Sequence, residues 1–168
     1  YATKAEKLST TVPDNSSIGA EFSIEVTDDI VLEGAQFRFT VANKEMTVGI
    51  DAKGEIYKEF QTTAGADLAI EVTSPQGTRS VLLSSKQALL MPAISDKFSF
   101  LQGYIMNNAV MSSQAFYGEK AKGIWKIKVL DTNGADIKAS GGIAQTKGYL
   151  NNTALSIVEG VAIRVFGH

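Results

Sequence analysis

One stretch of the chain, residues 65–83, constrains the fold more than any other. Leu68, Ile70 and Val72 alternate there with Glu71 and Thr73, and a period of two residues places the two sets on opposite faces of a β-strand. A Ser-Pro-Gln-Gly-Thr sequence follows, with proline where its fixed φ suits a tight turn and glycine where a positive φ is often needed. A second apolar run then returns along the first. The stretch predicts a half-buried β-hairpin, and it carries no nucleophile, base or metal cluster.

Alternation recurs along the rest of the chain, and no long helical pattern accompanies it. We expect strands within residues 21–26, 36–41, 98–106, 109–116, 124–130 and 161–166, and a hairpin from runs 46–50 and 56–60. Gly103 and the Asn107-Asn108 pair are expected to interrupt the strands around them, and Asp131 to Gly134 to form a hairpin turn. The stretch 86–95 fits a helical turn or a loop equally well. Short strands at such spacing predict an all-β, jelly-roll-like barrel or sandwich of about eight strands in two sheets.

Composition narrows the classes of partner. The chain has 168 residues, 44% of them hydrophobic, which suits one domain with one core. Its net charge of −2, with both signs scattered, argues against nucleic acid as a partner. No apolar run of about eighteen residues occurs, so we expect no membrane segment. The chain starts at Tyr1 without a signal peptide, so we expect a processed piece of a longer protein. It has no cysteine and therefore no disulfide, so we expect packing to stabilise it, together with calcium if a metal is bound.

Three blocks of sequence resemble one known family. Residues 65–78 are similar to Gly-Asp-Leu-x-Ile-x-Leu-x-Ser-Pro-x-Gly-Thr, residues 12–15 to an opening Ile-Pro-Asp-Asn, and residues 117–127 to Trp-Gly-Glu followed by Gly-x-Trp-x-Leu. All three are features of the P domain, or Homo B domain, which follows the catalytic domain in kexin-like and furin-like subtilisin-type serine proteases. Two departures are a Gln-Thr-Thr-Ala run in place of His-Thr-Tyr-Arg, and a stretch near 41–60 that is longer than in the family.

The resemblance implies a fold and a role. It implies a galactose-binding-domain-like jelly roll as a single domain at residues 12–168, with a hairpin insertion near 41–60. Residues 1–11 are expected to be a linker end, because they are rich in Ser, Thr and Lys and show little periodicity. It also implies a secreted bacterial accessory domain without chemistry of its own. Such a domain would pack on the catalytic domain of the same polypeptide and stabilise it, and would aid maturation or contact protein substrate. The alternative from the jelly-roll architecture is a carbohydrate-binding or adhesin-type module.

Few residues could carry catalysis. The single histidine, His168, is the last residue, where a mobile, solvated end would not hold a general base in place. The serines lie outside any Gly-x-Ser-x-Gly elbow. Asp28 and Asp29 are adjacent, and such a pair points to opposite faces on a strand or caps its own backbone in a turn. The chain is therefore expected to have no catalytic set.

Calcium is the metal that this sequence could bind, because its candidate ligands are carboxylate and carbonyl oxygens. Three candidate sites compete: Asp28 with Asp29, Asp67, and Asp131 with the residues that follow it. For Asp131 the competing interpretation is the Asn-Gly turn that follows it, and for Asp67 it is a carboxylate that binds loop amides at the start of a strand. Trp125, the one tryptophan, is expected in the core, because a large aromatic residue in an alternating strand usually packs there; the alternative, a carbohydrate-stacking role, would require it to be exposed.

Overall fold

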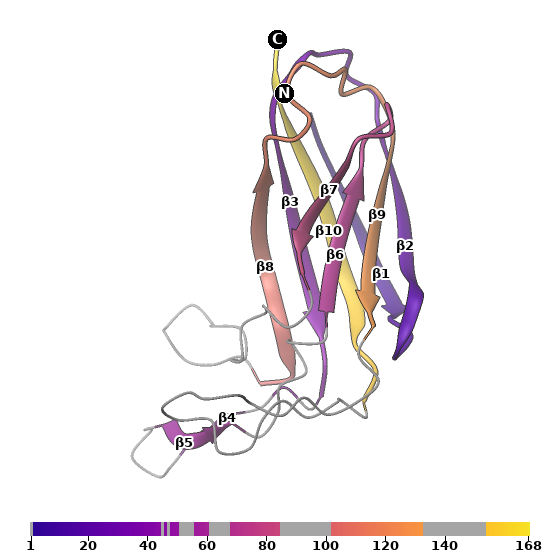
Figure 1. Cartoon of the computed structure of the whole chain (residues 1–168). Coiled ribbons are helices and arrows are strands. Elements are labelled where there is room, and N and C mark those ends of the chain that lie inside the picture. The colour runs from indigo at the N-terminus through magenta and orange to yellow at the C-terminus, as the bar shows by residue number, and fades with distance from the viewer. Residues whose placement is uncertain are drawn as a thin grey trace, which may run out of the picture.

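The fold is a sandwich of two antiparallel four-stranded β-sheets, with a separate two-stranded sheet beside it (Figure 1). The computed structural model describes residues 2–44, 46, 48–50, 56–60, 68–84, 102–132 and 154–168. Within these residues no helix is formed, and so none is long and apolar enough to cross a membrane. The all-β prediction of about eight strands in two sheets is confirmed.

The strands of each sheet come from distant parts of the chain. The first sheet has the order β1-β10-β3-β8, and we call it sheet A; the second has the order β2-β9-β6-β7 and is sheet B. Strands β4 and β5 pair only with each other, which confirms the predicted hairpin. The bounds are β1 (Ala2–Thr11), β2 (Ser16–Val26), β3 (Leu32–Ala42), β4 (Val48–Ile50), β5 (Ile56–Phe60), β6 (Leu68–Thr73), β7 (Arg79–Leu83), β8 (Tyr104–Ser113), β9 (Gly123–Asp131) and β10 (Ile157–Gly167).

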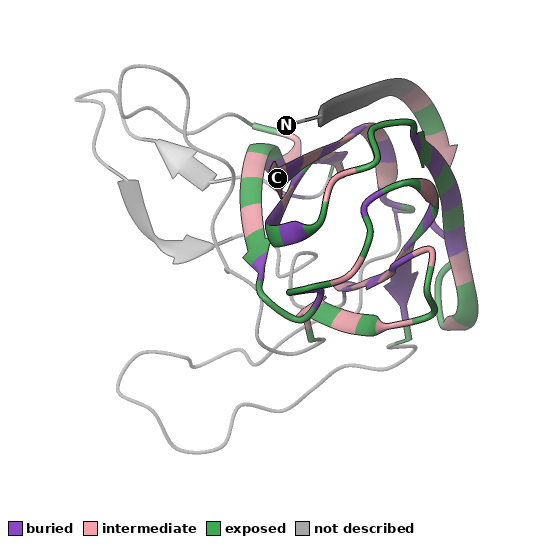
Figure 2. Ribbon diagram, turned by 90° about the horizontal axis from the view of Figure 1, so that it is seen from above, coloured by how far each residue is buried: buried purple, intermediate pink, exposed green. Residues whose placement is uncertain are grey.

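The core lies between the two sheets, where Figure 2 shows buried residues lining the inside of the sandwich. Strand β6 alternates strictly between buried and half-buried residues, as its sequence predicts. Phe37 from sheet A meets Trp125 from sheet B at a ring-centroid distance of 5.9 Å, and Phe116 lies 5.0 Å from Trp125, edge to face. Trp125 is fully buried and donates its indole N–H to the carbonyl of Ala121 at 2.9 Å. Its predicted place in the core is confirmed.

Two sequence predictions differ from the structure. Residues 1–11 were expected to end a linker, but Ala2–Thr11 form β1, which pairs with β10 along nearly its whole length. Tertiary pairing overrides the weak local pattern there. The expected break at Asn107-Asn108 does not occur either. Strand β8 runs through both residues, and Asn108 takes a positive φ of 51° beside a register shift, which is a bulge and not a turn.

Other predictions fall partly or wholly outside the described residues. The segment at 86–95 lies outside them, and so does most of the turn expected after Asp131. Residues 98–101 of the expected strand 98–106 also lie outside the described residues. The strand that is described in this region begins at Tyr104. These predictions stay predictions.

Candidate functional site

The three described loops at one end of the sandwich meet beside the first and last strands (Figure 1). We call this end, formed by residues 27–31, 74–78 and 114–122 with His168, the termini end. Backbone hydrogen bonds join the 114–122 loop to residues 30–32: Leu32 N donates to Glu119 O at 2.8 Å, Gly118 N donates to Leu32 O at 2.8 Å, and Ala121 N donates to Ile30 O at 2.9 Å. The turn at 74–78 is attached to the same loop through side chains.

The turn at residues 74–78 has the geometry that its sequence predicts. Gly77 N donates to Ser74 O at 2.9 Å, and Ser74 N donates to Thr78 O at 2.9 Å. Gly77 has a φ of 92°, which a residue with a side chain rarely adopts. The Ser74 hydroxyl also accepts a hydrogen bond from Thr78 N at 3.2 Å. The turn is therefore closed both by its backbone and by its first side chain.

Glu119 connects this turn to the loop between β8 and β9. Ser74 Oγ donates to one carboxylate oxygen of Glu119 at 2.6 Å, and Thr78 Oγ1 donates to the other. Ser74 is 4% exposed, so its hydroxyl depends on this acceptor. Two of the three blocks that carry the family resemblance thus meet at one carboxylate, although 41 residues separate Thr78 from Glu119.

A second contact joins the same two blocks. Gly123 has a φ of 135°, and a Cβ on this residue would lie 2.6 Å from Pro75 Cβ. That distance is shorter than carbon atoms tolerate, so the close approach of the two loops requires glycine. The glycine before Trp125 and the proline of the turn therefore serve the packing of the termini end.

The calcium candidates that the structure describes lie in different parts of the molecule. Asp28 and Asp29 lie in the exposed loop between β2 and β3, where Asp29 pairs with Lys120 at 3.1 Å. Asp131 is 1% exposed at the far end of β9, opposite Leu68 in the register. Asp67 lies outside the described residues. Within the described part of the chain, no three acidic, histidine or cysteine side chains cluster. Calcium binding at each of the three alternative places, at Asp28 with Asp29, at Asp67 or at Asp131, stays a prediction.

His168 is held more firmly than expected. Its backbone exchanges two hydrogen bonds with Val31, of 2.8 and 3.2 Å, instead of fraying. Its side chain is 82% exposed, with Nδ1 3.1 Å from the Glu33 carboxylate. Among the described residues, no serine hydroxyl bonds to this ring, so the described residues do not form a Ser-His-Asp triad.

A buried polar contact at the opposite end of the sandwich was not predicted. The Asn43 amide donates to Ala154 O at 2.9 Å and to Ser156 Oγ at 3.1 Å, and both Asn43 and Ser156 are 1% exposed. Nothing in the local sequence marks Asn43, because its partners are more than 110 residues away. Its role is to fix the end of β3 against the start of β10.

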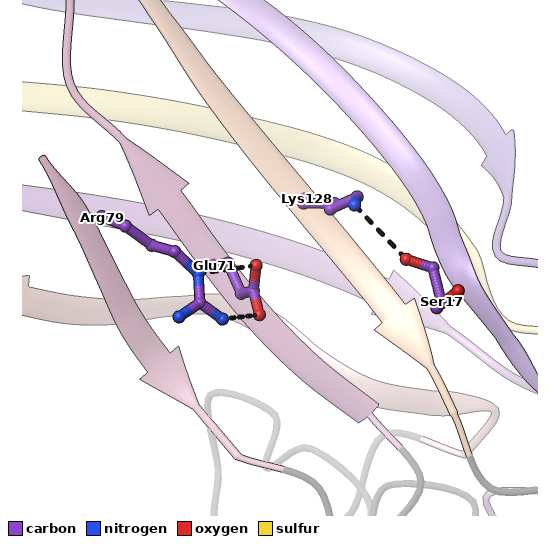
Figure 3. A network of polar contacts seen from close by, with 4 residues as sticks. All are labelled: Ser17, Glu71, Arg79 and Lys128. Atoms are coloured by element: carbon purple, nitrogen blue, oxygen red, sulfur yellow. Dashed lines mark hydrogen bonds and ion pairs between the residues drawn. The ribbon is translucent and has the colours of Figure 1, made fainter. Parts of the chain in front are cut away.

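The outer face of sheet B carries charges that neutralise one another (Figure 3). Arg79 of β7 forms an ion pair with Glu71 of β6, with Nε donating to Oε2 at 3.1 Å. This hydrogen bond, more than any other interaction, holds the pKa of Glu71 below its usual value of 4.5, and the positive charges of Arg79 and Lys128 add to the effect. Lys128 also donates to the carbonyl of Ser17 at 3.3 Å.

Comparison with known proteins agrees with these features. The model of the proprotein convertase P-domain family matches residues 55–153, more than half of the chain. The chain belongs to this family. The resemblance to the P domain is thereby confirmed, and the blocks at 65–78 and 117–127 lie within the match. The contacts of Glu119 and Gly123 are therefore contacts between two P-domain motifs.

Relatives of this P-domain chain are bacterial serine proteases. It is 39% identical over 66 residues to the Aeromonas extracellular serine protease of Aeromonas sobria, an alignment that covers 39% of this chain and 11% of the relative. It is 36% identical over 75 residues to the microbial serine proteinase of Aeromonas salmonicida, covering 44% of this chain and 12% of the relative. The alignments thus span about a tenth of the length of either relative.

Two solved structures share the fold. The crystal structure of the Aeromonas sobria serine protease in complex with its chaperone matches all of this chain with a TM-score of 0.69 and 19% identity, and the match covers 26% of that chain. The crystal structure of the Aeromonas sobria serine protease matches with a TM-score of 0.63 and 18% identity, covering 27% of its chain. At this identity the likeness shows the sandwich fold of the P-domain.

Proposed function

We propose that this chain is the non-catalytic P-domain of a secreted, subtilisin-like, kexin-type serine endopeptidase, and that it packs on the catalytic domain of the same polypeptide and stabilises it. The observation that carries the proposal is the P-domain match together with relatives that are extracellular serine proteases. Help with maturation and contact with protein substrate belong to the same proposal. The hydrogen-bonded sandwich supports the proposal, because a domain that stabilises its neighbour must keep its own structure.

The stabilisation has a simple physical basis. A domain tethered in the same chain faces its neighbour at a high effective concentration, so an interface of roughly 600–1,500 Å² is enough to hold the two together. The P-domain binds the folded catalytic domain and not its unfolded chain. By linkage, that preference raises the free energy of unfolding of the catalytic domain.

The test compares the parent protease with and without residues 1–168, because β1 (Ala2–Thr11) is part of the sandwich. We expect the deletion to lower the yield of active protease and the thermal midpoint of its catalytic domain, measured as residual activity after heating. A second variant, Trp125→Ala, keeps the full length but removes the largest side chain of the P-domain core, and it should lower the same midpoint. A replacement at the exposed Glu25 is the control. An unchanged yield and midpoint in both test variants would contradict a stabilising role.

The non-catalytic part of the proposal is tested on the chain alone. The purified chain should leave casein and short peptide substrates intact, even at concentrations far above those used for a protease. Hydrolysis that copurifies with the folded chain and is blocked by a serine-directed inhibitor would overturn it.

A further inference from the structure

Both ends of the chain lie at the termini end (Figure 1). Ala2, Val165 and Ala35 form one row across β1, β10 and β3. His168 exchanges two backbone hydrogen bonds with Val31, of 2.8 and 3.2 Å, so the last residue stays on the same surface. Any residues joined before Ala2 or after His168 therefore leave the sandwich beside the loops of this end. Whichever side a second domain is attached on, its connection starts here.

The place of this connection decides which surface a second domain meets first. Strand β1 has 10 residues, and at about 3.3 Å a residue it carries the chain about 30 Å away from the termini end. A domain attached at the termini end must span that further distance to reach the opposite end of the sandwich. The effective concentration of a tethered domain is high within reach of its linker and falls to near zero beyond it. The termini end is therefore the surface within easiest reach.

A large aromatic side chain on this surface is not used by the core. Tyr117, in the β8–β9 loop, is 73% exposed, and Val31, in the β2–β3 loop, is 36% exposed. A charged pair lies on the same two loops, with Lys120 Nζ 3.1 Å from Asp29 Oδ1. Protein interfaces combine an apolar centre, in which tyrosine is enriched, with a polar rim. The exposed residues of the termini end have this composition.

Hydrogen bonds on the residues next to Tyr117 hold its loop in place. Gly118 N donates to Leu32 O at 2.8 Å, and Glu119 accepts two side-chain hydrogen bonds from the turn at 74–78. A tyrosine on a backbone that is already ordered loses little conformational entropy when a partner covers it. Tyr117 is therefore suited to anchor an interface.

We infer that the termini end is the surface on which the catalytic domain of the same polypeptide packs, and that this contact buries Tyr117 and Val31. The catalytic domain comes from the proposed function, so this docking surface rests on that proposal and adds its location. Ile18 and Leu155 are also exposed apolar residues, at 74% and 46%. They lie at the opposite end of the sandwich, away from both ends of the chain.

The experiment uses the whole parent protease with the photo-crosslinking residue benzoylphenylalanine at one exposed apolar position at a time. Tyr117 reports on the termini end, Ile18 on the opposite end, Val110 on the outer face of sheet A and Val81 on that of sheet B. Mass spectrometry of the digested protein identifies the crosslinked peptides. We expect position 117 to crosslink to the catalytic domain with a yield about fivefold or more above that of the other positions. Dilution should not change this yield, because the contact lies within one polypeptide.

A substitution gives a second readout. Tyr117→Ser removes the anchor without touching the core, and Ile18→Ser is the matched control, because Ile18 is equally exposed. We expect Tyr117→Ser to shorten the half-life of protease activity at raised temperature about fivefold, the scale of one lost interface anchor. Ile18→Ser should leave the half-life unchanged. Far-ultraviolet circular dichroism of both variants shows that they are folded.

Crosslinks to the catalytic domain from position 18, 81 or 110 in place of 117 would overturn this docking surface, and so would the lack of any crosslink from 117. Crosslinks that disappear on dilution would also overturn it, because they come from a second copy of the protein. Equal half-lives of Tyr117→Ser and Ile18→Ser would exclude Tyr117 as the anchor. Crosslinks from 117 together with an unchanged midpoint after deletion of residues 1–168 would support the docking surface and contradict only the stabilising role.

Discussion

At the scale of single residues, Glu119 is central to the stability of the termini end, because its one carboxylate accepts hydrogen bonds from two hydroxyl groups of another loop. Replacement by alanine leaves the buried Ser74 hydroxyl without its acceptor. We expect Glu119→Ala to lower the free energy of unfolding by about 1–3 kcal/mol, measured by urea denaturation. Glu25→Ala, at an exposed site on β2, is the matched control, with an expected change within about 0.5 kcal/mol. Equal effects of the two variants would show that the bridge is not needed.

Glu71 gives a prediction of pH dependence. Because its hydrogen bond to Arg79 lowers its pKa in the folded state below 4.5, the pair stabilises the fold above the pKa of the unfolded chain, and this stabilisation is lost as the pH falls through the lower, folded pKa. Glu71→Gln should therefore lower the thermal midpoint slightly at pH 7, and the difference from the unmodified chain should shrink and be lost as the pH falls below 4.5 and through the lower, folded pKa. Both partners contact solvent, so added salt should shrink the effect. A difference that grows in acid would contradict this sign.

At the scale of elements, the approach of the β8–β9 loop to the turn at 74–78 depends on Gly123. An alanine there combines a strained φ of 135° with a contact of 2.6 Å to Pro75, and we expect a loss of about 2–4 kcal/mol in urea denaturation. Gly118→Ala separates the two causes, because Gly118 also has a positive φ, of 81°, but faces open space. It should cost about 1 kcal/mol. Equal losses at the two positions would exclude the steric part.

Elements with strict alternation could be predicted from the sequence. The strand around Ile70 was predicted with its correct buried face, and the strands around Ile127 and Ile163 were predicted as strands, because burial on one side imposes a period of two. The turn at 74–78 was predicted because proline and glycine restrict the backbone locally. Trp125 was placed in the core for its size and its alternating strand.

The elements that could not be predicted from the sequence depend on contacts between distant residues. Strand β1 lacks a clear pattern, and its partner β10 lies about 150 residues further along the chain. The continuity of β8 through Asn107-Asn108 depends on β3, whose pairing outweighs a local preference for a turn. Glu119 stands in a recognised motif, yet its partners Ser74 and Thr78 could be identified only from the structure. The three alternative calcium sites, at Asp28 with Asp29, at Asp67 and at Asp131, stay predictions.

At the scale of the whole molecule, the aromatic contact between Phe37 and Trp125 joins the two sheets. The hydroxyls of Ser80 and Ser113, 2.8 Å apart, join β7 to β8 along one side. Layers connected in this way should unfold together. We expect Trp125 fluorescence and far-ultraviolet circular dichroism to give the same urea midpoint. A fluorescence transition at lower urea than the dichroism transition would show that the layers separate first.

Ala2 and Val165 are direct partners across β1 and β10, so the chain enters and leaves the sandwich side by side. A short glycine-serine bridge can therefore join the two ends, and the tight connection at residues 12–15 then offers a place to open the backbone, giving a circular permutant with every strand pair retained. The same adjacency lets the domain be spliced into a surface loop of a host protein without pulling that loop apart.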